Sequence, residues 1–330
     1  MSTPYQQQGT APTDGPGGPV PPPAWQGHAP APHQGPGGQP PAPQFAAGAP
    51  GGYASPIPVR GTHFFHALAS EWTKIRTVRS TMWTLGTMFL IVVGVGALTA
   101  AGLSSSEQAQ TPLLAGGFFG LMLGQICIIT LGVLVVTSEF GTGMIRTTMT
   151  ACPSRGRVLA AKATVFFLLS FVMTTVATGL TALIQSSMLG GREPSEFASL
   201  PKGSVVDGVV IATGSEWLGA TVGAGLYVAL LGLLSLAVGS LLRHSAGAIT
   251  TMLGVVLLPL LLALFMATES LQTVREKLIE YSPLNGLASL YRMPMGGGGD
   301  GTGWDLLWIL AGVTAAALAG AFAMLHQRDV

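Results

Sequence analysis

Two histidines, His63 and His66, are the first residues in the chain whose type and spacing could bind a metal. Side chains three residues apart share one face of a helix, and imidazole is a common ligand for transition metals. The surrounding stretch supplies no third ligand. The two cysteines, Cys127 and Cys152, have no C-x-x-C spacing and no evident partner. We therefore predict neither a metal site nor a disulfide.

Sequence motifs for hydrolysis and nucleotide binding give no match. The chain contains no G-x-x-x-x-G-K-[ST] phosphate loop, no H-E-x-x-H zinc motif and no G-x-S-x-G nucleophile elbow. We expect no catalytic residue and no directly bound cofactor.

The segment 137–162 is the strongest candidate for a contact with another protein. Thr137 or Ser138 could cap a short helix beginning at Glu139, and Pro153 would end it. An apolar knob with one cation on such a helix would fit a groove on a partner, although a plain basic loop would also account for the composition. The side chains that the helix would expose are Phe140, Met144, Ile145 and Arg146, with Gly141 and Gly143 between them.

The elements that hold this segment are long apolar stretches. Of 330 residues, 48% are apolar and only 9% are charged, against about 25% charged in an average soluble domain. Six stretches approach or exceed 20 residues, which is the length needed to cross a bilayer, and none contains Asp, Glu, Lys or Arg. We predict an all-α polytopic membrane protein with six spans in the region 82–330, at about 82–103, 113–136, 163–185, 217–242, 246–268 and 306–325.

The distribution of basic residues predicts the orientation of the spans. With a cytoplasmic N-terminus, ten of the fifteen Lys and Arg residues fall on the cytoplasmic side, as topology signals require. We therefore expect a multi-pass protein of the cytoplasmic membrane with both termini in the cytoplasm. The net charge of +1 gives no reason to expect nucleic-acid binding.

Small residues at helical spacing mark places where helices could approach closely in lipid. The pairs are Gly120 with Gly124 and Gly219 with Gly223, and a third set comprises Ala315, Ala319 and Ala323. The pattern does not distinguish packing within one subunit from packing between two.

The N-terminal region 1–59 holds 16 of the 23 prolines, no Lys or Arg, and a single acid, Asp14. Such a composition cannot bury enough apolar surface to offset its ordering entropy, so we predict a disordered cytoplasmic tail. It would serve as a flexible spacer or as a docking segment for a partner that recognises proline-rich sequence.

The region 60–81 has the periodicity of an amphipathic helix. We predict that it lies in the cytoplasmic membrane interface, where apolar side chains enter the lipid and cations face the headgroups. A soluble helix packed on a partner is the alternative. The residues expected to form this interfacial helix are Phe65, Leu68, Trp72, Lys74, Ile75, Arg76 and Arg79.

The loop 269–303 on the opposite side also has helical spacing in two short parts. Leu271, Val274 and Leu278 form one apolar set, and Leu284 and Leu287 begin a second. This pattern predicts a short helical hairpin that either dips into the outer interface or lies on the surface.

Two stretches resemble the ABC-2 type permeases, the membrane-spanning subunits of bacterial ABC transporters. They are ASEWTKIRTVRST at 69–81 and SEFGTG at 138–143, the latter continuing through PSR at 153–155 to Lys162. The order of the spans and loops over residues 62–328 is compatible with the same family. The proline-rich tail departs from the usual family pattern.

The resemblance implies a fold, partners and a function. The fold would be the ABC-2, type V exporter-like architecture, with short re-entrant helices between the fifth and sixth spans. The partners would be a second six-span subunit and a separate ATPase that carries ATP and Mg²⁺. Residues 139–152 would include the coupling helix that contacts this ATPase. The chain would thus be the permease of an exporter, while an ATP-independent facilitator or channel and a membrane scaffold stay open as alternatives.

Overall fold

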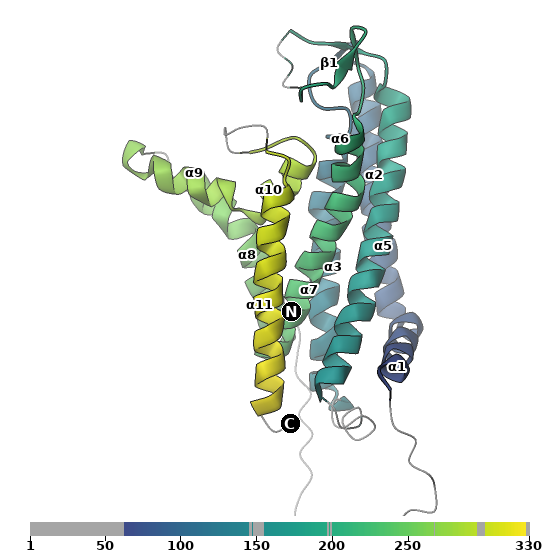
Figure 1. Cartoon of the computed structure of the whole chain (residues 1–330), viewed down its shortest axis with the longest axis vertical. Coiled ribbons are helices and arrows are strands. Elements are labelled where there is room, and N and C mark those ends of the chain that lie inside the picture. Colours follow the sequence, from purple (N-terminus) through teal and green to yellow (C-terminus); the bar gives the residue numbers. More distant parts are fainter. Residues whose placement is uncertain are drawn as a thin grey trace, which may run out of the picture. The chain divides into compact units, whose positions relative to one another are not determined.

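The computed structural model describes residues 63–144, 147, 155–196, 198, 200–266, 268–295 and 301–327. The tail 1–59 and its predicted disorder lie outside these residues. Within them, six helical segments are long and apolar enough to cross a membrane. These are α2 (Arg79–Ser104), α3 (Gly117–Gly141), α5 (Arg155–Leu189), α6 (Gly214–Leu218) continued through η1 (Gly219–Gly223) and α7 (Ala224–Leu242), α8 (Ser245–Phe265) and α11 (Trp304–Gln327) (Figure 1).

The prediction of a mostly helical protein with six long apolar helices is thus confirmed. Some of these helices begin or end at other residues than predicted. Residues Leu113 to Gly116 form turns before α3 begins, and α8 ends at Phe265 because Met266 leaves the helical conformation. The helix α5 begins at Arg155, so Lys162 lies within it. Apolar content alone does not fix these ends, because a turn of apolar residues reads like a helical one.

Among the six, α7 is the central helix. It packs against α3, α5 and α11, while α2 packs against α3 and α5. In the most apolar window of the segment Gly214–Leu242, 67% of residues are buried, compared with 22% in α8 and in α11. The exposed faces of α8 and α11 are themselves apolar, as Phe265 and Trp308 show, which suits contact with lipid or with another membrane helix.

Glycines allow the closest approaches between these helices. A Cβ atom on Gly120 would lie 2.6 Å from the carbonyl oxygen of Val92 in α2, and one on Gly124 would meet the Val92 side chain. Gly219 lies equally close to the backbone of Leu290. These two predicted motifs therefore mediate packing within the chain. The alanines predicted in the last span, Ala315, Ala319 and Ala323, lie exposed on α11.

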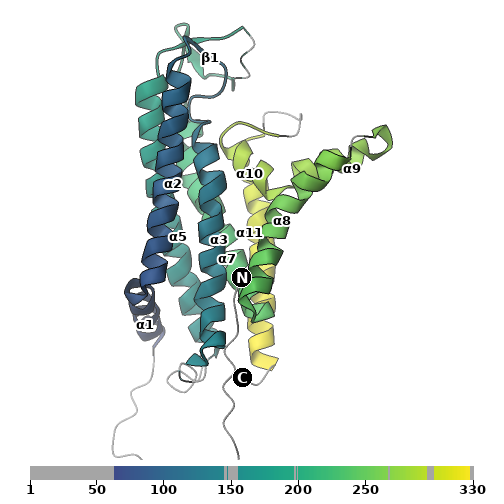
Figure 2. The same ribbon diagram turned by 180° about the vertical axis from the view of Figure 1, so that it is seen from behind.

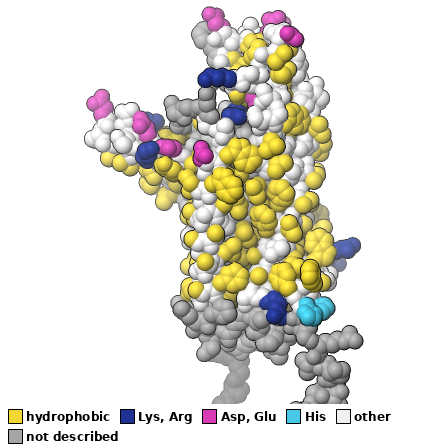
Figure 3. Space-filling model, in the orientation of Figure 1, with side chains coloured by type: hydrophobic (Ala, Val, Ile, Leu, Met, Phe, Trp, Pro, Cys, Tyr) yellow, Lys and Arg dark blue, Asp and Glu magenta, His cyan; other side chains and the backbone are white. Residues whose placement is uncertain are grey.

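One end of the bundle carries α1 (Phe64–Thr77), the last turn of α3, the start of α5 and the turn between α7 and α8 (Figure 2). Figure 3 shows a broad hydrophobic band on one face of the molecule, with Lys, Arg and His side chains near this end. Acidic side chains and further Lys and Arg side chains appear towards the opposite end on that face. Such a band between two charged ends is expected of a membrane-spanning bundle.

The opposite end contains the strands and the short helices. The strands β1 (Gln108–Ala109) and β2 (Glu193–Pro194) pair in parallel, and β3 (Val205–Val206) pairs with β4 (Val209–Val210) as a hairpin. Its turn residues Asp207 and Gly208 both have positive φ, as a two-residue hairpin turn requires. Strands of two residues are too short to leave a periodic pattern, so the sequence did not predict them.

The predicted helical hairpin between the last two spans is present. The short helix η2 (Glu269–Leu271) leads into α9 (Gln272–Glu280), and α10 (Pro283–Leu290) follows. The helix α8 leans away from α11 and carries α9 to the side of the bundle (Figures 1 and 2). The two helices of the hairpin differ in environment, because α9 is largely exposed whereas α10 buries Leu284, Leu287 and Leu290.

Candidate functional site

Four charged side chains meet inside the bundle, at the end that carries α1. Glu71 and Lys74 come from one face of α1, Glu139 from the last turn of α3, and Lys162 from the third turn of α5. We call these four residues the charge cluster. Three separate helices thus contribute to it.

The charge cluster is a closed ring in which each ammonium binds both carboxylates. Lys74 Nζ lies 2.6 Å from Glu71 Oε1 and 3.0 Å from Glu139 Oε1. Lys162 Nζ lies 2.7 Å from Glu71 Oε2 and 2.8 Å from Glu139 Oε1. Charge-assisted hydrogen bonds at these distances are among the strongest that side chains make. The ring fixes the positions of α1, α3 and α5 relative to one another.

Burial makes the balance of charge important. The side chains of Glu71, Glu139 and Lys162 are 3%, 7% and 5% exposed, whereas that of Lys74 is 28% exposed. Two cations and two anions sum to zero, so the ring places no net charge in the interior. Removing one member would leave an uncompensated buried charge, which typically costs about 3–5 kcal/mol.

The pKa of Lys74, on the helix outside the spans, lies above its usual value. Burial alone lowers the pKa of an ammonium, but the hydrogen bonds and charges of Glu71 and Glu139 outweigh this effect. Lys74 is therefore positively charged at neutral pH.

Three of these residues have other predicted roles in the sequence. Lys74 belongs to the predicted interfacial helix, Glu139 to the predicted partner contact and Lys162 to the basic segment before the third span, while Glu71 has no predicted role. Glu71 and Lys162 are 91 positions apart. The sequence does contain a usable signal, because two acids and two lysines lie on the predicted interfacial helix or next to predicted span ends, all on one predicted side of a chain with few charges.

The predicted start of a helix at Glu139 is wrong. The helix α3 continues without a break to Gly141, and the Thr137 hydroxyl donates to the carbonyl of Val133 within that helix instead of capping a new one. Glu139 consequently lies in the charge cluster and not on an exposed surface. A Thr residue in mid-helix commonly bonds back in this way, so it gives no capping signal by itself.

Among the other residues of the predicted partner contact, some are partly buried and some are exposed. The Arg243 guanidinium stacks 5.0 Å from the Phe140 ring centroid, which leaves Phe140 half-buried. Gly141 ends α3 and is exposed, Gly143 has a φ of 71°, and Met144 is 46% exposed. Ile145 and Arg146 lie outside the described residues. The contact with an ATPase stays a prediction.

The predicted interfacial helix needs one correction. It ends at Thr77, because Val78 adopts an extended conformation, and Arg79 is the first residue of α2. The break turns the chain from α1 into the first span.

The remaining residues of α1 face different environments. Ile75 is buried, Leu68 is half-buried, and Phe65 and Trp72 are 78% and 49% exposed. The exposed aromatics and the exposed Arg76 fit the interfacial prediction, in which aromatic rings and cations sit at headgroup level.

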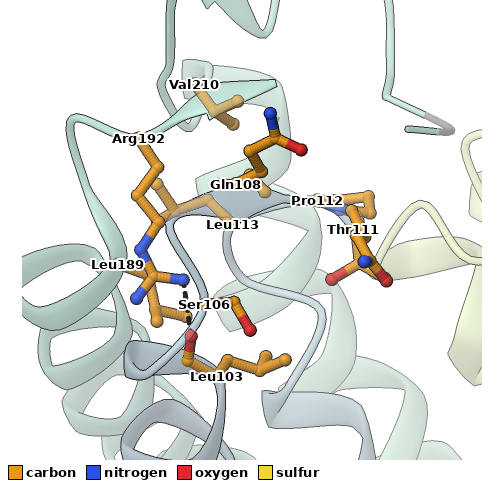
Figure 4. A pocket seen from close by; sticks show the side chains of 11 residues that line it. Leu103, Ser106, Gln108, Thr111, Pro112, Leu113, Leu189, Arg192 and Val210 are labelled. Atoms are coloured by element: carbon orange, nitrogen blue, oxygen red, sulfur yellow. Dashed lines mark hydrogen bonds between the residues drawn. The ribbon is translucent and has the colours of Figure 1, made fainter. Parts of the chain in front are cut away.

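No group of three potential metal ligands occurs among the described residues. At the opposite end of the molecule, a cavity of about 80 Å³ lies beside Arg192, whose guanidinium donates to the Leu103 carbonyl at 2.8 Å (Figure 4). A space of that size holds at most a few water molecules. Arg192 serves there to tie the end of α2 to the loop after α5.

Comparison with models of known protein families and with curated protein sequences gave no match.

Proposed function

We propose that this chain is the permease subunit of an ABC-2 type exporter, driven by an ATPase on a separate polypeptide. The stretches 69–81 and 138–143 resemble that family, and six helices able to cross a membrane are compatible with it. The observation that carries the proposal is the charge cluster, because it joins α1 to the two helices, α3 and α5, that flank residues 142–154.

The proposed mechanism is mechanical. Closure of the ATPase around ATP and Mg²⁺ would push on residues 142–154, which connect the end of α3 to the start of α5. The charge cluster would pass this displacement to α1, because Glu71 and Lys74 move with their partners. The bundle would then repack between inward-open and outward-open states that differ in affinity for the nucleotide-bound partner.

A second six-span subunit would pair with this chain in the cytoplasmic membrane, and both termini would lie in the cytoplasm with the ATPase. The uncharged spans suit lipids, lipid-linked molecules, hydrophobic drugs or peptides as substrates, and no residue selects among these classes.

The test is co-reconstitution of this chain with a co-encoded ATPase subunit. Met144→Glu combined with Arg146→Glu should abolish transport and reduce permease-stimulated ATP hydrolysis about tenfold, because the two changes reverse the apolar and cationic character of the contact. Arg76→Glu is the control, since Arg76 is exposed at the same end but on α1. Unchanged coupling in the double variant would refute the assigned contact. Solute flux without any ATPase would identify a facilitator instead.

A further inference from the structure

A cavity of about 490 Å³ opens beside the charge cluster, between α1, the start of α2 and the last turns of α3. Pockets for small molecules generally enclose 300–1,000 Å³, so this one is large enough for part of an amphiphile. The cavity shares Met144 with the contact assigned to the ATPase. The inference drawn from it requires only that the chain sits in a membrane.

The walls of the cavity combine apolar and polar side chains. Leu131, Leu134 and Val135 of α3 form the apolar part, and Leu134 is 39% exposed on the outer face of the bundle. Lys74 and the hydroxyl-bearing Thr77 and Ser80 line the cavity near the junction of α1 and α2. Along α3 the lining changes from Leu131, Leu134 and Val135 to Ser138, Glu139 and Thr142 at the end that carries α1, which is the order of acyl chain and headgroup in a phospholipid.

All four members of the charge cluster line the cavity and their charges sum to zero, but the most exposed of them is a cation. Both carboxylates of the charge cluster are at most 7% exposed, whereas the Lys74 side chain is 28% exposed. An ammonium has three donors, and Lys74 uses two of them on Glu71 and Glu139. The third is available to a phosphate oxygen, which Lys binds well as a point charge.

We propose that this cavity binds an anionic phospholipid from the leaflet that surrounds α1. Its phosphate lies at Lys74 beside the hydroxyls of Thr77 and Ser80, and an acyl chain lies against Leu131, Leu134 and Val135. A lipid bound there contacts α1, α2 and α3 at once, next to the ring that joins α1 to α3.

The experiment measures lipid retained by the full chain in detergent, using native mass spectrometry after delipidation and re-addition of phosphatidylglycerol or phosphatidylcholine. Wild-type protein should bind phosphatidylglycerol with a clear preference. Leu134→Trp should bind it about tenfold more weakly, because the larger ring fills the apolar part of the cavity. Leu123→Trp is the matched control, since Leu123 is also exposed on α3, 44% against 39%, and lies about 16 Å away along the helix axis.

A second variant tests the headgroup contact. Lys74→Gln should remove the preference for phosphatidylglycerol over phosphatidylcholine among the folded molecules, because the exposed ammonium is lost and the ring keeps one uncompensated negative charge. Equal phosphatidylglycerol binding by the two tryptophan variants would overturn the proposal, and so would equal binding of the two lipids by the wild type. ATP hydrolysis plays no part in these measurements, so they can fail or succeed independently of the transporter assignment.

Discussion

Four charged side chains from three helices meet at the end of the bundle that carries α1. Three of the four members of the charge cluster are almost fully buried, and each carboxylate contacts both ammoniums. Buried ion pairs of this kind are weak evidence for high stability, since desolvation offsets most of the attraction. We expect them to enforce specificity, because an arrangement of α1, α3 and α5 that separates them leaves charges without partners.

We expect the charge balance of the ring to matter more than any one residue. Glu139→Gln and Lys162→Met should each destabilise the protein by about 3 kcal/mol, because each leaves a buried net charge. The double variant should lose much less than the sum of the two, since its ring is neutral again. Thermal unfolding in nanodiscs measures the loss of stability in the two single variants and in the double variant. A double-variant loss equal to the sum of the single losses would show that charge balance in the ring does not matter.

The raised pKa of Lys74 gives a pH dependence with a definite sign. A group whose pKa is raised on folding contributes stability below its unfolded value, near 10.5, and loses that contribution as pH rises through its folded value. The stability difference between wild type and Lys74→Met should therefore be constant from pH 7 to about pH 10 and shrink above it. The control is Arg76→Met on the exposed face of α1, for which the difference should not change over this range.

At the scale of elements, close packing depends on a few glycines while other glycines are dispensable. Gly120 lies against the backbone of Val92, and backbone cannot move aside as a flexible side chain can. Gly86, on α2, has no atom within 4 Å of the place where a Cβ would stand. The chain is rich in glycine, so composition alone does not reveal which positions are essential.

These two glycines make a matched pair of variants. Gly120→Ala should destabilise the bundle by about 1–3 kcal/mol, because α2 and α3 must separate to admit the methyl group. Gly86→Ala should be neutral or slightly stabilising, since Ala favours the helix by up to about 1 kcal/mol. Unfolding midpoints of the purified variants test this, and equal effects at the two positions would show that α2 and α3 do not pack as described.

At the scale of the whole membrane unit, the helices alternate in direction, so α1 and the short strands lie at opposite ends (Figures 1 and 2). Lys and Arg are concentrated in the parts of the sequence that we assign to the α1 end. The proposed orientation follows from this asymmetry, because positive loops are retained on the cytoplasmic side.

Cysteine labelling in intact cells tests that orientation. After replacement of Cys127 and Cys152 by Ser, Asp207→Cys in the β3–β4 turn should react with a membrane-impermeant maleimide. Arg76→Cys on α1 should react only after the membrane is permeabilised. Labelling in the reverse order would place both termini outside the cytoplasm.

The sequence by itself determined the number of long apolar helices, the short helices of the loop 269–303 and the two glycine motifs. These features are local, since about 20 consecutive residues decide whether a helix can cross a bilayer. The tertiary structure alone decided that Glu71, Lys74, Glu139 and Lys162 meet. Their meeting depends on where three helices end and on how each helix is rotated about its axis. The packing of the spans sets these ends and rotations, and only then do residues 65 and 91 positions apart become neighbours.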